Sequence, residues 1–446
     1  MSALLSHYAT LPQSQAPKAR TLGIGMIGCG TVGTGTLKLL HRLEGIRIEK
    51  VAVRDLTLPR TLPEGLQADA LLTTNTETDV LTNPAVDIVV EVAGGIEPAF
   101  TWLKTAIQHG KHVVTANKAL IATHGQELFA LAQEHGVQLL FEAAVAGGIP
   151  IIQPLKQCLA ANRIHSIAGI LNGTTNYMLT RMMDDGWSYE EALTKAQSLG
   201  YAEADPTNDV GGFDAAYKLA ILASIAFGVA VSMDDLHIEG ITTITQADMD
   251  YARKFGYAIR LIGLAQWDET HQQPSVRVHP MFVKQSHPLA GIRNEYNAVW
   301  VEGDAVGDVM FYGKGAGELP TASSVVSDVL ALANDAWQGN TRLATSLAMT
   351  PSPSTPCLPM SETENRYYIR LVTKDEAGVL AKLGEAFGRE GVSLESFLQT
   401  PNEADKCANL MLITHTAKES NLQATLAAIA QQSTTQSVAC VLRVLG

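Results

Sequence analysis

Short apolar runs alternate with amphipathic segments over the first 150 residues. Each run is brief and rich in β-branched residues, as buried strands are, and the segments between the runs have helical spacing. Strands that alternate with helices are joined by right-handed crossovers, which produce a parallel sheet with helices on both faces. The pattern therefore predicts an α/β fold with a doubly wound parallel sheet over residues 21–150. The runs are 22–27, 46–53, 87–95, 111–120 and 137–148, with helices expected in 99–110 and 125–136.

After Pro150 the pattern loosens into helices mixed with alternating stretches. Helices are expected near 175–184, 188–199 and 212–228. The alternation in "SIAGIL" and "SVRVHPMFV" indicates strands of a second sheet. An α+β domain is therefore predicted over residues 151–319.

The remaining third of the chain predicts a returning helix, a linker and a small module. In "GKGAGELPTASSVVSDVL" a glycine-rich turn opens a helix over about 320–340, which we expect to pack back on the first domain. Residues 345–365 are rich in Pro, Ser and Thr without periodicity, as linkers are. Residues 366–446 have the order β-α-β-β-α-β, which predicts a ferredoxin-like fold.

Composition narrows the class of protein. The 446 residues are 46% hydrophobic and carry a net charge of -13 without a basic block, which argues against a nucleic-acid partner. No apolar run approaches the roughly 18 residues of a membrane span. The five cysteines are scattered and odd in number, which fits reduced thiols. Residues 1–20 lack the pattern of a secretory signal and are expected to be a flexible tail. We therefore expect a cytoplasmic protein that contacts no membrane.

The first run leads into Gly28-x-Gly30-x-x-Gly33 and then a helix. The first glycine permits a tight turn, the second lets the backbone approach a pyrophosphate, and the third lets helix and strand pack closely. The helix start, with Thr31 and Val32, supplies N–H donors to the phosphates. The context predicts dinucleotide binding; the alternative is a glycine-rich turn without a ligand.

The second run ends at Arg54 and Asp55. An arginine at this position suits the 2′-phosphate of NADP, whereas a carboxylate holds the free 2′-hydroxyl of NAD. Because Arg54 comes first, NADP is favoured. NAD remains possible, with Arg54 solvated and Asp55 on the ribose.

Lys118 lies in the fourth run, at the end of a strand where open α/β sheets bind ligands. A lysine there can hydrogen-bond a substrate oxygen, or exchange a proton if its pKa is lowered. A solvated lysine that opens a helix is the alternative.

The stretch "EADPTNDVGGFDAAYKLAI" concentrates charge before and on an apolar helix. Asp214 and Lys218 are four residues apart and share one face, with apolar neighbours. Buried charges need partners, which Glu203, Asp205 and Asp209 are near enough to supply. The segment predicts an acidic pocket with one or two lysines, suited to a small substrate with an ammonium group and a hydroxyl or carbonyl. A buried ion pair that only joins loop to helix is the alternative.

Six motifs together resemble homoserine dehydrogenase, in its monofunctional form with a C-terminal ACT domain. They occur in family order between residues 22 and 335, and the ACT-like part covers 366–446. The motifs are "GCGTVG", "VTANKAL", "FEAAVAGGIPII", "ILNGTTNYML", "YAEADPTNDVGGFDAAYKLAIL" and "GKGAGELPTASSVVSDVL".

The resemblance implies reversible, NAD(P)-dependent interconversion of L-homoserine and L-aspartate 4-semialdehyde, in threonine, methionine and isoleucine biosynthesis. Lys218 would exchange the proton, assisted by Lys118 and Asp214 as further catalytic residues. The implied substrate-binding residues are Glu203, Asp209, Asp214 and Gly200. The implied cofactor-binding residues are Gly28, Gly30, Thr31, Val32, Gly33, Arg54, Lys118, Gly200, Glu203 and Gly317.

The resemblance also implies a monovalent cation, Na⁺ or K⁺, held by main-chain carbonyls that spacing alone would not reveal. Those carbonyls belong to Glu142, Val145, Gly147 and Ile149.

In the ACT-like part, the loop "DEAGV" would bind an amino-acid effector, for which we expect threonine as the pathway's end product. The loop residues are Asp375, Ala377, Gly378 and Val379. Since ACT modules usually pair, a homodimer or homotetramer is expected. A module that only joins subunits is the alternative.

Two other functions are weighed against this one. Aspartate-semialdehyde dehydrogenase needs an acylating cysteine, but Cys158 lies in a helical pattern with no nearby histidine base. An amino-acid sensor with an inactive dehydrogenase half would not need the intact lysine and carboxylate set.

Overall fold

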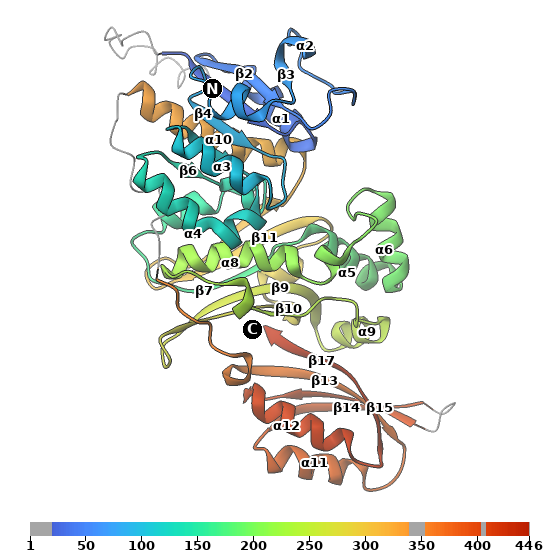
Figure 1. Cartoon of the computed structure of the whole chain (residues 1–446). Helices are drawn as coiled ribbons and strands as arrows, with labels where there is room; N and C mark the ends of the chain where they lie inside the picture. The colour runs from blue at the N-terminus through green and yellow to red at the C-terminus, as the bar shows by residue number, and fades with distance from the viewer. Residues whose placement is uncertain (1–19, 339–352, 403–406, 446) are drawn as a thin grey trace, which may run out of the picture.

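The structure is a computed structural model that describes residues 20–338, 353–402 and 407–445 (Figure 1). Of the expected tail and linker, residues 1–19 and 345–352 lie outside the described residues. Two sheets organise the chain, one in the first domain and a longer one that runs from the middle of the chain to its C-terminus. In the part of the chain that the structure describes, no helix has the length and apolar character needed to cross a membrane.

The first domain is a six-stranded parallel sheet in the order β3-β2-β1-β4-β5-β6. This order reverses direction between β1 and β4, and ligands bind at the carboxyl ends of the strands beside such a switch point. The strands are β1 (Leu22–Ile27), β2 (Ile46–Ala52), β3 (Leu72–Thr73), β4 (Ile88–Glu91), β5 (His112–Thr115) and β6 (Leu139–Leu140). The helices are α1 (Thr31–Leu40), α2 (Ala68–Leu71), α3 (Ala99–Gln108) and α4 (Lys118–Glu134).

Helix α10 (Glu318–Trp337) returns to this first domain, as its sequence predicts. It packs against α1, where a Cβ added to Gly35 would stand 2.6 Å from the carbonyl oxygen of Glu318. The absence of a side chain at Gly35 therefore allows the two helices to approach closely.

The second domain places helices over a mixed sheet. Its strands are β7 (Ile164–Ile170), β8 (His237–Ile238), β9 (Tyr257–Asp268), β10 (Gln273–Lys284), β11 (Tyr296–Gly303) and β12 (Gly307–Lys314). Its helices are α5 (Gly173–Asp185), α6 (Tyr189–Ser198), α7 (Thr207–Val210), α8 (Phe213–Phe227) and α9 (Gln246–Lys254).

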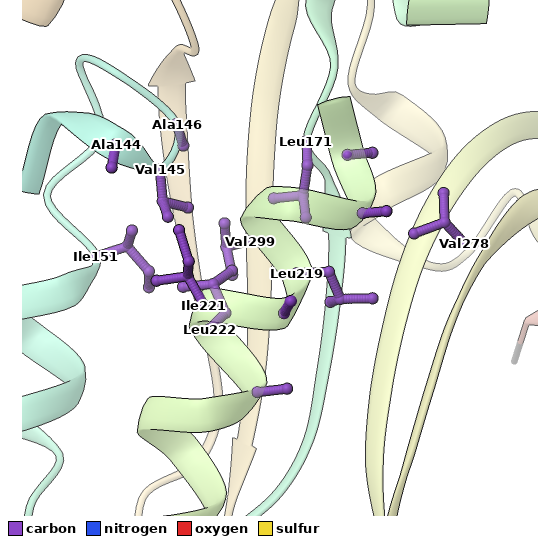
Figure 2. Packing of buried hydrophobic residues seen from close by; sticks show 14 of the residues in the cluster. Ala144, Val145, Ala146, Ile151, Leu171, Leu219, Ile221, Leu222, Val278 and Val299 are labelled. Atoms are coloured by element: carbon purple, nitrogen blue, oxygen red, sulfur yellow. The ribbon is translucent and has the colours of Figure 1, made fainter. Parts of the chain in front are cut away.

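Helix α8 is the buried centre of this domain. Figure 2 shows Leu219 beside Leu171, which follows β7, while Ile221 and Leu222 lie beside Val299 of β11 and Ile151. All of these side chains are buried. The apolar contacts hold the helix that carries Lys218 in one position, since cores are packed as tightly as organic crystals.

The C-terminal elements follow the predicted order and form a ferredoxin-like unit. They are β13 (Glu364–Lys374), α11 (Val379–Arg389), β14 (Leu394–Asn402), β15 (Cys407–Thr414), β16 (Ala417–Lys418), α12 (Glu419–Ala430) and β17 (Thr435–Leu445).

The sheet of this unit is continuous with the sheet of the second domain, which the sequence did not indicate. Strand β17 pairs in parallel with β10, residues 443–445 with 281–283. The result is an eleven-stranded sheet. Nine strands follow the order β12-β11-β7-β9-β10-β17-β13-β15-β14, while β16 pairs with β13 and β8 pairs with β10. Across the junction the rings of Phe282 and Tyr368 stack with their centroids 4.1 Å apart.

Candidate functional site

The turn between β1 and α1 leaves an open cradle. Gly28 has φ +101°, and a Cβ there would stand 2.8 Å from a backbone nitrogen of the loop after β4. A Cβ on Gly33 would stand 2.5 Å from the carbonyl oxygen of Gly28, so the third glycine is needed for the turn itself. Gly30, in contrast, has no atom of the described residues within 4 Å of the position of a Cβ, and it is the N-cap of α1. The residues present thus fit a dinucleotide pyrophosphate over Gly30, at the N–H groups of Thr31 and Val32.

Arg54 and Asp55 follow β2 with different surroundings. Arg54 is exposed. Asp55 Oδ1 accepts hydrogen bonds from Thr57 N (2.8 Å) and Thr57 Oγ1 (2.7 Å), which lower the pKa of its carboxyl group. Burial raises the pKa of the Cys29 thiol in the phosphate loop.

The carboxyl ends of β4 and β5 are tied together by the buried Glu91. Its carboxylate accepts from two backbone N–H groups of the loop after β4, at 2.8 and 2.9 Å, and from Thr115 Oγ1 at 2.6 Å. Asn117 then caps α4 by accepting from Leu120 N at 3.1 Å. These bonds fix the start of α4, and with it Lys118, at the edge of the sheet.

Two lysines and two aspartates converge at the start of α8. Lys218 Nζ lies 2.7 Å from Asp214 Oδ2, and Lys118 Nζ lies 3.2 Å from Asp214 Oδ1. Asn172 donates from Nδ2 to Asp209 Oδ1 (2.6 Å) and to Asp214 Oδ2 (2.9 Å). Asn172 is the N-cap of α5 and was not singled out in the sequence, where an Asn before a helix ordinarily reads as a cap.

Burial and the neighbouring charges shift the pKa values of these groups. Burial acts to raise the pKa of Asp214, but the charges of Lys218 and Lys118 hold it well below its usual range. Burial lowers the pKa of Lys218 despite the neighbouring Asp214 charge, and its ammonium also donates to the Leu171 carbonyl at 2.7 Å. Burial raises the pKa of Asp209. The cluster therefore keeps one carboxylate ionised and makes one lysine easier to deprotonate.

Two of the four predicted carboxylates lie outside this cluster. Asp205 is exposed and accepts from Thr207 N (3.1 Å) and Thr207 Oγ1 (2.6 Å) at the start of α7. Glu203 is also exposed. The expectation that both would partner the buried lysine is wrong, because they lie on a solvated turn where water can hydrate them.

The two remaining glycines of the predicted site both have positive φ, +75° at Gly200 and +129° at Gly317. Gly200 follows α6, and the carbonyl of the next residue, Tyr201, accepts from Thr174 Oγ1 of α5 at 2.7 Å. Gly317 is the N-cap of α10. The Gly200 turn thus adjoins the start of α5, where Asn172 lies.

The four residues whose carbonyls would hold a cation, Glu142, Val145, Gly147 and Ile149, are buried. The Glu142 carboxylate accepts from three consecutive backbone N–H groups at 2.6 to 2.8 Å. The Gly147 carbonyl accepts from Ser324 Oγ of α10 at 2.7 Å. Among the described residues no group of three or more His, Cys, Asp and Glu side chains could hold a metal ion. Any cation here would depend on main-chain oxygens.

The loop before α11 is open to solvent. Asp375 and Ala377 are exposed, and Asp375 Oδ1 accepts from Gln399 Nε2 at 3.2 Å. Gly378 has φ +92° and caps the helix without a side-chain hydrogen bond, and Val379 is its first residue. No side chain of the described residues caps this helix start, so its N–H groups can bind a carboxylate.

Alcohol oxidation with a dinucleotide requires a phosphate cradle and a group that takes the hydroxyl proton. The chain has a phosphate cradle at the switch point. The buried Lys218 contacts Asp214, and Asp214 contacts Lys118, which lies at the same edge of the sheet as the cradle. Fold and site together define an NAD(P)-dependent oxidoreductase.

Comparison with known proteins identifies the family. The model of homoserine dehydrogenase matches residues 150–330, that of the homoserine dehydrogenase NAD-binding domain matches 28–142, and that of the ACT domain matches 367–433. Homoserine dehydrogenase of Synechocystis sp. is 45% identical over 95% of this chain and 100% of its own length. That of Bacillus subtilis is 40% identical over 96% and 99%.

Solved structures agree with the family models. A homoserine dehydrogenase from Thiobacillus denitrificans superimposes with a TM-score of 0.88 at 41% identity, over 95% of this chain and 98% of that one. The chain belongs to the homoserine dehydrogenase family. This confirms the resemblance carried by the six sequence motifs, and the cysteine-dependent alternative through Cys158 is not supported.

Proposed function

We propose that this chain oxidises L-homoserine to L-aspartate 4-semialdehyde, reversibly and with NADP, through Lys218 as the proton acceptor. The buried Lys218–Asp214–Lys118 cluster carries the proposal, because it combines an ionised carboxylate with a lysine of lowered pKa. A nicotinamide, when bound, accepts the hydride from the alcohol carbon. The neutral Lys218 amine accepts the hydroxyl proton as the carbonyl forms.

The other residues bind and orient the substrate. Lys118 would donate to the substrate oxygen, and the ion pairs of Asp214 with both lysines support this arrangement. Asp209 and Glu203 would receive the substrate ammonium, with Gly200 and Gly317 lining the pocket. Such positioning is a large part of the rate enhancement in reactions of this type.

The test of this function is a rate measurement by NADPH absorbance, with L-aspartate 4-semialdehyde as substrate. A catalysed, semialdehyde-dependent loss of NADPH supports the proposal. Tight amino-acid binding without turnover would instead favour the sensor with an inactive dehydrogenase half.

We favour NADP because Arg54 is exposed while Asp55 is engaged by Thr57. A hyperthermophilic archaeal homoserine dehydrogenase, 26% identical with a TM-score of 0.58, is described in complex with NADPH. Arg54→Ala should raise KM for NADPH far more than KM for NADH, because a phosphate ion pair is lost. Equal effects on the two cofactors would show that Arg54 does not contact the 2′-phosphate.

We further propose that a monovalent cation, Na⁺ or K⁺, binds the carbonyls of Glu142, Val145, Gly147 and Ile149. The buried backbone of this segment supports the proposal. Activity should fall when a bulky organic cation replaces Na⁺ and K⁺ in the assay, and unchanged activity would contradict it.

The domain division proposed is residues 21–150 with the helix at 320–340, residues 151–319, and the ACT domain over 366–446.

For the ACT domain we propose feedback inhibition by L-threonine, bound at the loop of Asp375 and Gly378. We propose a homodimer or homotetramer, which light scattering would establish. The exposed apolar side chains of β12, Met310 (39%) and Tyr312 (53%), support self-association.

A further inference from the structure

The α7 turn, which carries Asp209, packs against a segment made of residues 239–241. Ile241 N donates to the Val210 carbonyl of α7 at 2.9 Å. A Cβ on Gly240 would stand 2.1 Å from that same carbonyl oxygen, so the segment approaches α7 as closely as a backbone can. A displacement of this segment would therefore move Val210 and the adjacent Asp209 with it.

The same segment begins at Glu239, which is anchored on both its backbone and its side chain. Glu239 N donates to the Val278 carbonyl of β10 at 2.7 Å. Its Oε1 lies 2.6 Å from Arg443 Nη1 and 2.6 Å from His237 Nε2. The pKa of Glu239 is lowered to about 2: burial opposes the shift, and the bonds from His237 and Arg443 outweigh it. The carboxylate is therefore charged at neutral pH.

Arg443 belongs to the ACT domain and is buried, with 4% of its surface exposed. Its Nη2 lies 2.8 Å from Oε1 of the equally buried Glu419, the first residue of α12. Glu419 Oε2 in turn accepts from Tyr367 Oη of β13 at 2.9 Å. One guanidinium thus bridges the interior of the ACT domain and the segment that supports α7.

We propose that Glu239 is a positioning residue, through which Arg443 of the ACT domain holds the α7 turn and its Asp209 in the geometry that binds substrate. The inference rests on the proposed function, since it takes Asp209 to be a substrate contact. The contact lies outside the substrate and cofactor sites, so its effect reaches the substrate through the backbone of residues 239–241, which lies against Val210 and the Gly211–Gly212 turn.

Of the Glu239–Arg443 pair, Glu239 is the residue to substitute, because Arg443 keeps Glu419 as a partner when the Glu239 carboxylate is removed. Glu239→Ala should raise KM for homoserine roughly 2- to 30-fold, the range over which mutations in coupled networks act. The value of kcat and KM for NADP should be unchanged, because Lys218 keeps its bonds to Asp214 and the Leu171 carbonyl, and the phosphate loop lies in the first domain. Glu239→Gln, which keeps a hydrogen-bond acceptor for Arg443, should show a smaller rise.

A second ion pair across the same junction provides the matched control. Arg370 Nε of β13 lies 2.8 Å from Asp248 Oδ1, and Asp248 belongs to α9, not to the segment that touches α7. Asp248→Asn should lower the melting temperature without changing KM for homoserine.

These measurements distinguish a failure of the positioning role from a failure of the proposed function. Wild-type protein without homoserine oxidation would refute the proposed function. Active wild-type protein whose Glu239→Ala variant melts earlier but keeps its KM would refute only the positioning role. An equal rise in KM for homoserine in Asp248→Asn would also refute it, because any loosening of the junction would then suffice.

Discussion

At the scale of single residues, the Lys218 side chain is buried and hydrogen-bonded. It donates to Asp214 and to the Leu171 carbonyl, so its removal leaves Asp214 with Lys118. Lys218→Ala should therefore fold and bind cofactor, while kcat falls about 10²–10⁴-fold, as general acid–base groups contribute. Lys218→Arg, which keeps the charge but does not deprotonate, should be equally slow. A Lys218→Ala variant that retains a tenth of the wild-type kcat, measured by NADPH absorbance, would remove Lys218 from the catalytic role.

The lowered pKa of Lys218 also sets the direction of a pH dependence. The neutral amine is the base in homoserine oxidation, so kcat/KM should rise with pH up to a pKa below the ordinary value of lysine. The ammonium is the acid in semialdehyde reduction, so kcat/KM should fall through the same region. Asp214 stays ionised throughout, because its pKa is held well below its usual range. Parallel pH profiles for both directions, measured at saturating cofactor, would contradict this assignment.

At the scale of elements, the glycines between β1 and α1 have two different roles. Gly28 and Gly33 allow the turn to form, whereas Gly30 is expected to contact the cofactor. A Cβ on Gly33 meets the Gly28 carbonyl at 2.5 Å, whereas a Cβ on Gly30 meets no atom within 4 Å in the part of the chain that the structure describes. Gly30→Ala should therefore keep the wild-type melting temperature and lose dinucleotide affinity, because the methyl group occupies the cradle. Gly33→Ala should lower the melting temperature as well. Thermal unfolding and cofactor titration by fluorescence measure the two effects, and tight binding by Gly30→Ala would place the pyrophosphate elsewhere.

The elements also show what could be predicted from sequence. The parallel sheet, α8 and the C-terminal β-α-β-β-α-β order followed from periodicity, since each depends on local pattern. Asp214 and Lys218 were paired because four residues make one helical turn. Asn172 was missed, because it lies far along the chain from Asp209 and Asp214, to which it donates. Glu203 and Asp205 were assigned to the buried lysine on proximity in sequence, which does not determine the direction in which a turn points.

At the scale of the whole molecule, the ACT domain is part of the main sheet. β17 lies beside β10, Tyr368 stacks on Phe282, and Arg443 reaches Glu239. No periodicity in the sequence indicates which two strand edges will pair, so this joint could not be predicted. A truncation before Glu364 would strip β10 of a neighbour and expose its backbone. The truncated chain should therefore melt at a lower temperature, and a loss of threonine response in it would not by itself identify an effector site.

Feedback by threonine is better tested inside the intact chain. Asp375 is exposed and accepts a hydrogen bond from the exposed Gln399, and its neighbour Glu376 is exposed as well. Asp375→Ala should leave kcat and the melting temperature unchanged, while the threonine concentration for half-inhibition rises at least about tenfold, as expected when a charge-assisted hydrogen bond to an amino-acid ligand is lost. Glu376→Ala, with the same charge removed one residue away, should respond to threonine as wild type does. If millimolar threonine leaves the wild-type rate unchanged, the regulatory proposal is wrong, and the domain serves to complete the sheet and join subunits.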